Sequence, residues 1–264
     1  MVPFSIREIG VRGVCCWGFD LRFLGLNLAG SAPDCCVYRG RGNRFVHHDF
    51  HFVDGPERIA MITIVNYGVG NLGALVNMFE FIGCDVRIAD ESSHILDASH
   101  LVLPGVGAFD TAMNRLRNSQ LIPSLEQAVL QRKVPLLGVC LGMQLLGRRS
   151  EEGSGVGLGW ISGDTVRMQP DPSFNLKVPF MGWAEIECSP TARLFDADSE
   201  QRFYFTHSYQ LRCDHSSDVA GIYQFDGPVV SAVQHENIYG VQFHPEKSHR
   251  FGMRLLSNFV ERSR

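Results

Sequence analysis

The sequence predicts an α/β fold, with a mixed and largely parallel central sheet flanked by helices and an antiparallel extension in the second half. Two observations support this prediction. From residue 61 onward, short apolar runs of strand length alternate with amphipathic stretches of helical period, which is typical of a parallel sheet covered on both faces. After residue 150, strand-like runs follow one another across turn residues such as Gly227-Pro228, which is typical of antiparallel hairpins.

In the first half, strands and helices alternate along the chain. A glycine-rich turn over residues 67–71 joins the first strand to the first helix, but it lacks the G-x-G-x-x-G spacing and the P-loop lysine, so we expect no nucleotide there. The carboxyl ends of parallel strands meet at one edge of a sheet, where we expect Gly105 and Cys140. The predicted strands are 62–65, 86–89, 101–103 and 135–137, and the predicted helices are 72–82, 108–116, 121–131 and 143–146.

The second half is richer in short strands. Because their turns join consecutive strands, we expect them to extend the same sheet in antiparallel fashion. Residues 61–264 contain no repeat and no interdomain linker, so they are predicted to form one domain. The predicted strands are 158–168, 184–188, 202–205, 219–225, 229–234 and 238–243, and a closing helix is predicted over residues 251–260.

Residues 1–60 differ from the rest of the chain, because arginine, glycine and paired cysteines interrupt their apolar positions without a clear period. The cysteine pairs at 15–16 and 35–36 lack the two-residue gap of zinc knuckles. A metal site formed by these cysteines with the nearby His47, His48 and His51 is therefore not the favoured interpretation. We interpret residues 1–60 as a poorly structured extension or an upstream stretch from a mis-assigned start, with Met61 as the functional start.

Composition excludes several classes of protein. A formal net charge of −4 and a pI near 6.2 give no basic surplus for binding nucleic acid or an anionic membrane. The longest nearly apolar stretch, residues 134–147, is too short to cross a bilayer. Outside the two pairs, the cysteines are widely scattered, which suits a reducing compartment better than a disulfide framework, so we expect a cytoplasmic protein with a small-molecule or protein partner.

The most informative stretch is G-V-C-L-G over residues 138–142. An apolar run before it and a helical run after it place Cys140 at a strand-to-helix turn, where nucleophiles sit. Glycines two residues to either side let the backbone bend sharply, and the following helix aims its amide hydrogens at the thiol. A buried core cysteine is the alternative interpretation of the pattern alone.

A second motif, Q-F-H-P-E, ends the last predicted strand at residues 242–246. His244 and Glu246 are two residues apart, so in extended geometry their side chains would share a face and could act as a base and its orienter. Pro245 suits a strand terminus. Together with the Cys140 turn, this spacing favours a nucleophile–histidine–carboxylate site over a structural histidine.

Taken together, these motifs resemble the class I, triad-type glutamine amidotransferases, and among them the glutaminase subunits of imidazole glycerol phosphate synthases. The resemblance covers residues 61–264 and implies the flavodoxin-like fold of that family. The Gly-Val-Cys-Leu-Gly and His-Pro-Glu motifs are shared by all triad amidotransferases. Segments 66–71, 103–109 and 181–183 resemble this subunit in particular. The matching segments are 66–71, 103–109, 138–144, 181–183, 177–179, 203–205, 207–209 and 240–248.

The resemblance implies that the protein hydrolyses L-glutamine to glutamate and ammonia without a metal or other cofactor. Cys140 would attack the side-chain amide carbon, His244 would move the proton, and Glu246 would orient His244. Backbone amides at Gly105, Val106, Gly107 and Leu141 would form the oxyanion hole. The glutamine's amino-acid end would be held by Gln144, Thr206, His207 and Ser208.

The same resemblance implies a heterodimer in which ammonia passes to a separate (β/α)8-barrel cyclase that makes imidazole glycerol phosphate and AICAR in histidine biosynthesis. Lys247, Ser248 and residues 181–183 are the candidate interface. Phe180 and Ala184 stand where the family usually has histidine and asparagine, so a paralogue that supplies ammonia for surface-sugar amidation is the nearest alternative. A γ-glutamyl hydrolase or cysteine peptidase on the same fold, and a non-catalytic binding subunit, are the others.

Overall fold

The computed structural model describes residues 60–196 and 199–263. The interpretation of the stretch that precedes Ala60, with its cysteine pairs and histidines, therefore falls outside the described residues. Within the described part, no helix is long and apolar enough to cross a membrane.

The central sheet has eight strands in the order β2-β1-β3-β4-β12-β11-β10-β7. Neighbouring strands from β2 through β12 run parallel, and β11, β10 and β7 continue the sheet in antiparallel fashion, so the predicted fold class is confirmed. The strands are β1 (Met61–Val65), β2 (Asp85–Ala89), β3 (His100–Leu103), β4 (Leu136–Val139), β7 (Glu187–Cys188), β10 (Val219–Gln224), β11 (Pro228–His235) and β12 (Ile238–Val241).

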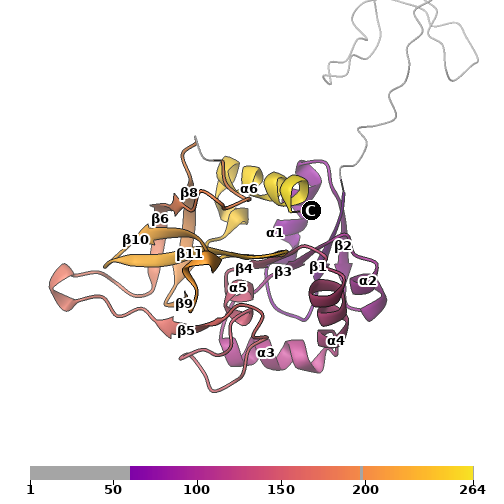
Figure 1. Cartoon of the computed structure of the whole chain (residues 1–264), viewed down its shortest axis with the longest axis horizontal. Coiled ribbons are helices and arrows are strands. Elements are labelled where there is room, and N and C mark those ends of the chain that lie inside the picture. The colour runs from indigo at the N-terminus through magenta and orange to yellow at the C-terminus, as the bar shows by residue number, and fades with distance from the viewer. Residues whose placement is uncertain (1–59, 197–198, 264) are drawn as a thin grey trace, which may run out of the picture. The chain divides into compact units, whose positions relative to one another are not determined.

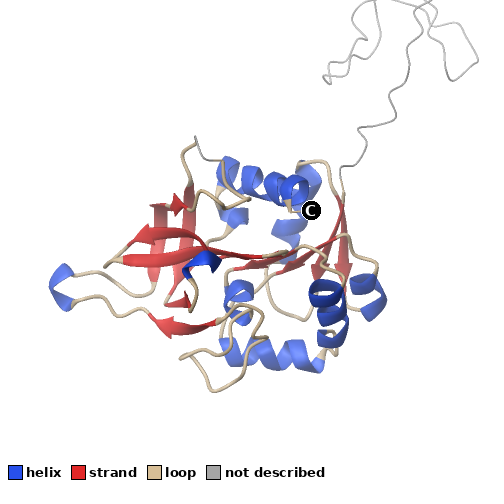
Figure 2. Ribbon diagram, viewed as in Figure 1, coloured by secondary structure: helices blue, strands red, loops and turns tan. Residues whose placement is uncertain are grey.

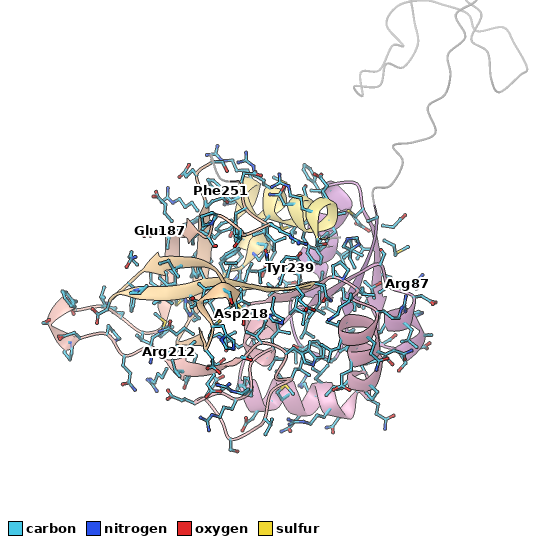
Figure 3. All side chains as sticks on the ribbon, viewed as in Figure 1. Arg87, Glu187, Arg212, Asp218, Tyr239 and Phe251 are labelled. Atoms are coloured by element: carbon cyan, nitrogen blue, oxygen red, sulfur yellow. The ribbon has the colours of Figure 1, made fainter. Side chains whose placement is uncertain are left out.

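Helices cover both faces of this sheet, with α1 and α6 on one side and α3 and α4 on the other (Figure 1). Each side has its own apolar core: Phe79 and Phe259 belong to one buried cluster, and Phe109 and Leu125 to the other. Tyr239 of β12, labelled in Figure 3, is fully buried in the first. The helices are α1 (Leu72–Phe81), α2 (Ser92–Leu96), α3 (Phe109–Asn118), α4 (Ile122–Glu126), α5 (Leu141–Leu145) and α6 (His249–Arg262).

Four strands of the second half form two separate two-stranded sheets, which lie beside the antiparallel part of the central sheet (Figure 2). β5 (Gly163–Arg167) pairs with β9 (Tyr209–Cys213), and β6 (Phe180–Glu185) pairs with β8 (Arg202–His207). The expectation that every predicted strand of this half extends one sheet is therefore wrong for β5, β6 and β8. Only Ser208 separates β8 from β9, so the chain passes from one small sheet to the other at a single residue.

Several predicted boundaries also differ from the structure. The strand predicted over residues 158–168 begins only at Gly163, because Leu158 and Trp160 donate backbone hydrogen bonds to the carbonyls that end α5 instead of pairing with a strand. The helix predicted over residues 121–131 is α4 followed by a π-helical turn, Gln127–Gln131. α2 and β9 were not predicted at all.

Candidate active site

Cys140 sits in a strained turn between β4 and α5. Its backbone has φ 54° and ψ −110°, a conformation that non-glycine residues rarely adopt and that costs about 1–3 kcal/mol. The Cys140 amide donates to the carbonyl of Val241 at 2.7 Å, and its carbonyl accepts from the Met143 amide at 3.1 Å. These bonds on both sides hold the turn in place, as predicted for a nucleophile elbow.

The two flanking glycines are required by close backbone packing. A Cβ atom added at Gly138 would lie 2.9 Å from the carbonyl carbon of Gly142, and one added at Gly142 would overlap the carbonyl oxygen of Leu103. Gly105 packs from the other side, where an added Cβ would lie 2.6 Å from the Gly142 amide nitrogen. β3, β4 and the start of α5 therefore approach each other more closely than any side chain would allow.

His244 and Glu246 form the second half of the site. His244 Nδ1 lies 2.7 Å from a Glu246 carboxylate oxygen, and both side chains are buried. The pairing was predicted, but the extended geometry was wrong. β12 ends at Val241, and residues Pro245–Lys247 form a 3-10 turn. Proline at the first position of this turn has the φ that a helical turn requires, so it favours turning over extension.

The pKa of His244 reflects its surroundings. Burial lowers this pKa, but the interactions with Cys140 and then Glu246 outweigh burial and raise it to about 9. The raised pKa favours an imidazolium over a neutral imidazole at neutral pH. Glu246 accepts a hydrogen bond from His244 Nδ1. Nε2 is therefore the ring nitrogen that remains available to interact with Cys140.

This pKa predicts how stability depends on pH. A histidine whose folded-state pKa lies above its unfolded value of 6.5 stabilises the fold below about pH 6.5 and loses that contribution as the pH rises through about 9. We expect the free energy of unfolding, measured in urea, to fall across this window in the native protein. The slope should be smaller in His244→Asn, and an equal slope in both proteins would contradict the assignment.

The sheet register brings the cysteine and the histidine together. Val139 pairs with Val241 in the parallel β4–β12 ladder, so the chain segments that follow these residues leave the sheet side by side. The amide of His244 then donates to the carbonyl of Tyr204 in β8 at 2.9 Å, which fixes the start of the 3-10 turn. Cys140 and His244 consequently line the same cavity, of about 320 Å³.

Most residues predicted to bind substrate line this cavity. Gly105 does not, because it is packed behind the elbow. Gly107 in the cavity wall has φ 96° and open space where a Cβ would stand, so the loop conformation itself requires glycine. The predicted residues that do line the cavity are Val106, Gly107, Leu141, Gln144, Thr206, His207 and Ser208.

The cavity wall also contains residues that the sequence interpretation missed or assigned elsewhere. Glu152, Pro179 and Tyr209 were not predicted, and Lys247 was assigned to the partner interface. Glu152 comes from the loop after α5, and its carboxylate accepts a hydrogen bond from the Phe109 amide at 2.9 Å. Glu152 belongs to no motif with a recognisable spacing, so only the folded chain identifies it, and Tyr209 lies in the matching segment 207–209 but was given no role there.

His207 in the wall is a neutral, hydrogen-bonded histidine. Because a carbonyl oxygen can only accept, Nδ1–H donates to the Tyr209 carbonyl at 2.8 Å, and Nε2 accepts from the Tyr223 hydroxyl at 2.9 Å. Burial lowers the pKa of His207 to about 4. Both ring nitrogens are therefore occupied within the protein, which indicates that His207 shapes the wall.

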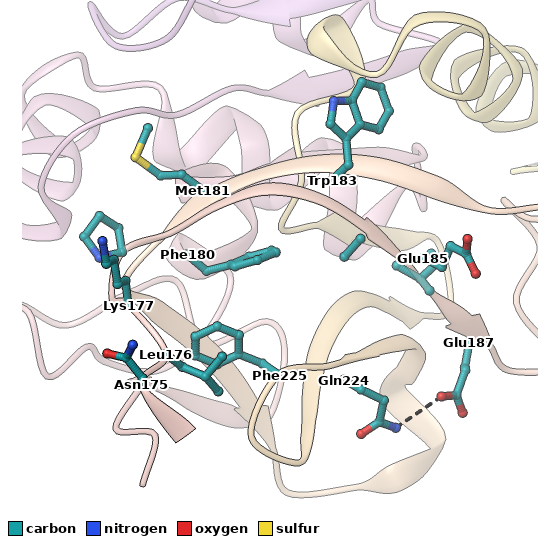
Figure 4. Close-up of a pocket in the computed structure, with 13 residues that line it drawn as sticks. Asn175, Leu176, Lys177, Phe180, Met181, Trp183, Glu185, Glu187, Gln224 and Phe225 are labelled. Atoms are coloured by element: carbon teal, nitrogen blue, oxygen red, sulfur yellow. Dashed lines mark hydrogen bonds between the residues drawn. The ribbon is translucent and has the colours of Figure 1, made fainter. Parts of the chain in front are cut away.

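A larger groove, of about 910 Å³, runs along β6. The β6 side chains alternate: Met181 and Trp183 are 63% and 36% exposed, whereas Phe180 points to the opposite side of the strand toward Phe225 (Figure 4). Phe180 also stacks on Tyr223, with ring centroids 5.2 Å apart. Phe180, which stands where the family usually has histidine, therefore lies on the inner side of β6, behind the side chains that β6 exposes.

Two other members of the candidate interface differ from each other in exposure. Lys247 is exposed at the mouth of the small cavity, but Ser248 is fully buried. The Ser248 hydroxyl donates to the His244 carbonyl at 2.6 Å and accepts from the Tyr204 amide at 3.0 Å. Ser248 therefore braces the His244 turn, and its assignment to a docking surface was wrong.

The chain is similar to known proteins in both sequence and fold. Residues 63–263 match the family described as glutamine amidotransferase class-I. The chain is 45% identical over 204 residues to the imidazole glycerol phosphate synthase subunit HisH 2 of Methanococcus maripaludis, a match that covers 77% of this chain and all of the relative. It is 42% identical over 202 residues to the HisH subunit of Leptospira borgpetersenii, covering 76% of this chain and 99% of the relative.

Among solved structures, a crystal structure titled as a glutamine amidotransferase matches with a TM-score of 0.60 and 18% identity, covering 76% of this chain and 98% of that one. A putative GMP synthase subunit from Thermoplasma acidophilum matches with a TM-score of 0.57 and 20% identity, covering 76% of this chain and 92% of that one. At these identities the likeness concerns the fold, and it agrees with a mostly parallel sheet flanked by helices.

Proposed function

Because this chain belongs to the class I glutamine amidotransferase family, we propose that it is the glutaminase subunit of an imidazole glycerol phosphate synthase, which hydrolyses L-glutamine and passes the ammonia to a cyclase subunit. The relatives that carry this subunit's name match the chain at 42–45% identity over nearly their full lengths. The observation that carries the chemistry is the strained Cys140 beside the buried His244–Glu246 pair in one cavity.

In the proposed reaction, the Cys140 sulfur attacks the side-chain amide carbon of glutamine. His244 takes up the thiol proton and delivers it to the departing nitrogen, so ammonia leaves and a thioester forms. Water then adds to the thioester carbon, and glutamate and the free thiol are released. Glu246 keeps the His244 ring oriented and stabilises its positive charge through both steps.

The negative charge on the attacked oxygen needs amide donors. The Leu141 amide, directly after the nucleophile, and the Val106–Gly107 loop line the cavity beside Cys140 and are the proposed donors. The amino-acid end of glutamine carries an ammonium and a carboxylate. We assign the ammonium to the side of Glu152 and the carboxylate to the side of Lys247, because each of these side chains carries the charge opposite to that of the group assigned to it.

The proposed partner is a cyclase of (β/α)8-barrel fold that docks over the mouth of the cavity as the second half of a heterodimer. Met181 and Trp183 on the exposed side of β6 are the apolar anchors of this proposal. Trp183 is held rigid by stacking on His249, with centroids 5.6 Å apart and planes 8° apart, and a rigid, half-exposed tryptophan suits an interface anchor.

The test is glutamate production by the full chain, measured alone and then with the cognate cyclase and its nucleotide substrate. We expect stimulation of roughly tenfold or more, within the range of typical coupling between sites. Free glutamine should be hydrolysed and γ-glutamyl peptides should not, which distinguishes the proposal from a γ-glutamyl hydrolase. If the protein is folded but the cyclase does not stimulate it, a different ammonia acceptor, such as the surface-sugar pathway, would be favoured. Phe180 would then be the first residue to test.

Two broader expectations accompany this function. We propose that residues 61–264 form the amidotransferase domain, and the family match over residues 63–263 supports this proposal. A cytoplasmic location stays a prediction from the scattered cysteines.

A further inference from the structure

One buried polar side chain beside the nucleophile has no role in the chemistry above. Gln242 follows β12 directly and is fully buried. Its Nε2 lies 3.7 Å from the Cys140 sulfur, within hydrogen-bond range for a sulfur acceptor. An amide with no access to water is costly to bury unless its polar atoms are paired, so its orientation and partners matter.

The hydrogen bonds fix which end of the Gln242 amide faces the sulfur. Gln144 lies 3.3 Å from the carbonyl oxygen of Tyr209, which can only accept, so the Gln144 group at that point is its NH2. The same NH2 lies 3.0 Å from the Gln242 amide, so the Gln242 atom that it contacts is the acceptor Oε1. The NH2 of Gln242 is thereby directed at Cys140.

We propose that Gln242 is a further catalytic residue of this site, whose Nε2–H donates a hydrogen bond to the Cys140 sulfur and stabilises its thiolate. The proposal deepens the proposed glutaminase function and rests on Cys140 being its nucleophile. The backbone supports the placement, because the Gln242 amide donates to the Ser231 carbonyl at 2.8 Å and so holds the residue against β11. A neutral donor in a buried site favours the negative charge of a thiolate over the neutral thiol.

The other titratable groups near the sulfur set the background for this effect. His244 faces Cys140 from the 3-10 turn and carries the positive charge of the pair. Tyr67 faces it from the loop after β1, but burial and then the charge of Cys140 raise the pKa of Tyr67, and its hydroxyl donates to the Pro104 carbonyl at 2.5 Å. The remaining titratable groups of the cavity wall are Glu152, His207, Tyr209 and Lys247.

The experiment measures thiolate formation without using glutamine, so it is independent of whether the protein hydrolyses glutamine. The full chain is alkylated with iodoacetamide over a range of pH, and modification of the peptide that contains Cys140 is followed by mass spectrometry, because the chain has other free cysteines. In Gln242→Met, which keeps the length of the side chain and removes the donor, we expect the thiolate midpoint to rise by roughly one pH unit, or about tenfold in thiolate population at a fixed pH.

Gln242→Glu provides a second test. It retains an acceptor for Gln144 but replaces the donor by a carboxylate, so the midpoint should rise at least as far. The matched control is Ser231→Ala, which removes a buried hydroxyl without a hydrogen-bond partner among the described residues and should leave the midpoint unchanged. Thermal unfolding of each variant establishes that it is folded.

The outcomes separate the proposal from a packing role. A rise of the midpoint in both Gln242 variants supports the proposal, even if glutamine turnover is absent in the native protein. An unchanged midpoint in the folded variants would overturn it. So would a loss of alkylation by the same factor at every pH, because that result would mean that Gln242 only packs against Cys140.

Discussion

Replacing Cys140 by alanine should lower the rate of glutamate production by about 10⁴-fold or more, because loss of the proposed nucleophile removes the covalent route entirely. The wall of the proposed glutamine cavity should be unchanged, so binding of glutamine, measured by calorimetry, should remain within a few-fold of the native value. The complex with the cyclase should still make product when ammonium salt replaces glutamine, since only the ammonia source is lost.

The matched control for this variant is Cys188→Ala. Cys188 is half-buried at the edge strand β7, outside the small cavity, and burial raises its pKa to about 12, so it is a protonated and unreactive thiol at neutral pH. Its substitution should leave turnover unchanged. Glutamine-dependent product formation by the Cys140→Ala complex at an appreciable rate would refute the assigned chemistry.

Replacing Gly142 by alanine should destabilise the fold by about 3 kcal/mol or more. The added methyl group would overlap the Leu103 carbonyl oxygen, which belongs to a fully buried strand and cannot move without disturbing the sheet. The urea midpoint of unfolding, or the yield of folded protein, reports the loss. Glutamate production by any folded fraction should also fall, because the Leu141 amide would be displaced.

Gly73→Ala is the control for this substitution. Gly73 lies in the first turn of α1, where a Cβ would meet no atom within 4 Å, and alanine is the better helix former. We expect this variant to be more stable than the native protein by up to about 1 kcal/mol. A destabilisation of equal size in both variants would show that the close approach at the elbow is not the cause.

Much of the first half of the fold could be predicted from local pattern. The strands up to β4 are short apolar runs separated by helices, and all four were located to within a few residues. Cys140 could be identified because glycines two residues to either side of a cysteine indicate a sharp turn with close backbone packing. His244 and Glu246 could be paired because their contact is local, although the structure achieves it with a 3-10 turn.

Other parts depend on contacts between distant residues. The contact of Gln242 with Cys140 joins positions 102 residues apart and exists only because β4 and β12 are neighbours in a particular register. Glu152 reaches the cavity because its loop is tied to the start of α3. β9 was not predicted because only one residue separates it from β8 in the sequence, and that residue gives no turn signal.

The alternation along β6 has a consequence for how such proteins diversify. Met181, Trp183 and Glu185 face outward, whereas the residues between them face the interior. Substitutions in the outer row can therefore change the surface that β6 offers to another protein, whereas substitutions in the inner row, where Phe180 and Ala184 lie, change how β6 packs. The elbow has no such freedom, because a side chain at Gly138 would meet the Gly142 backbone and one at Gly142 would overlap the Leu103 carbonyl oxygen. The surface that β6 presents can thus vary while the turn that holds Cys140 stays the same.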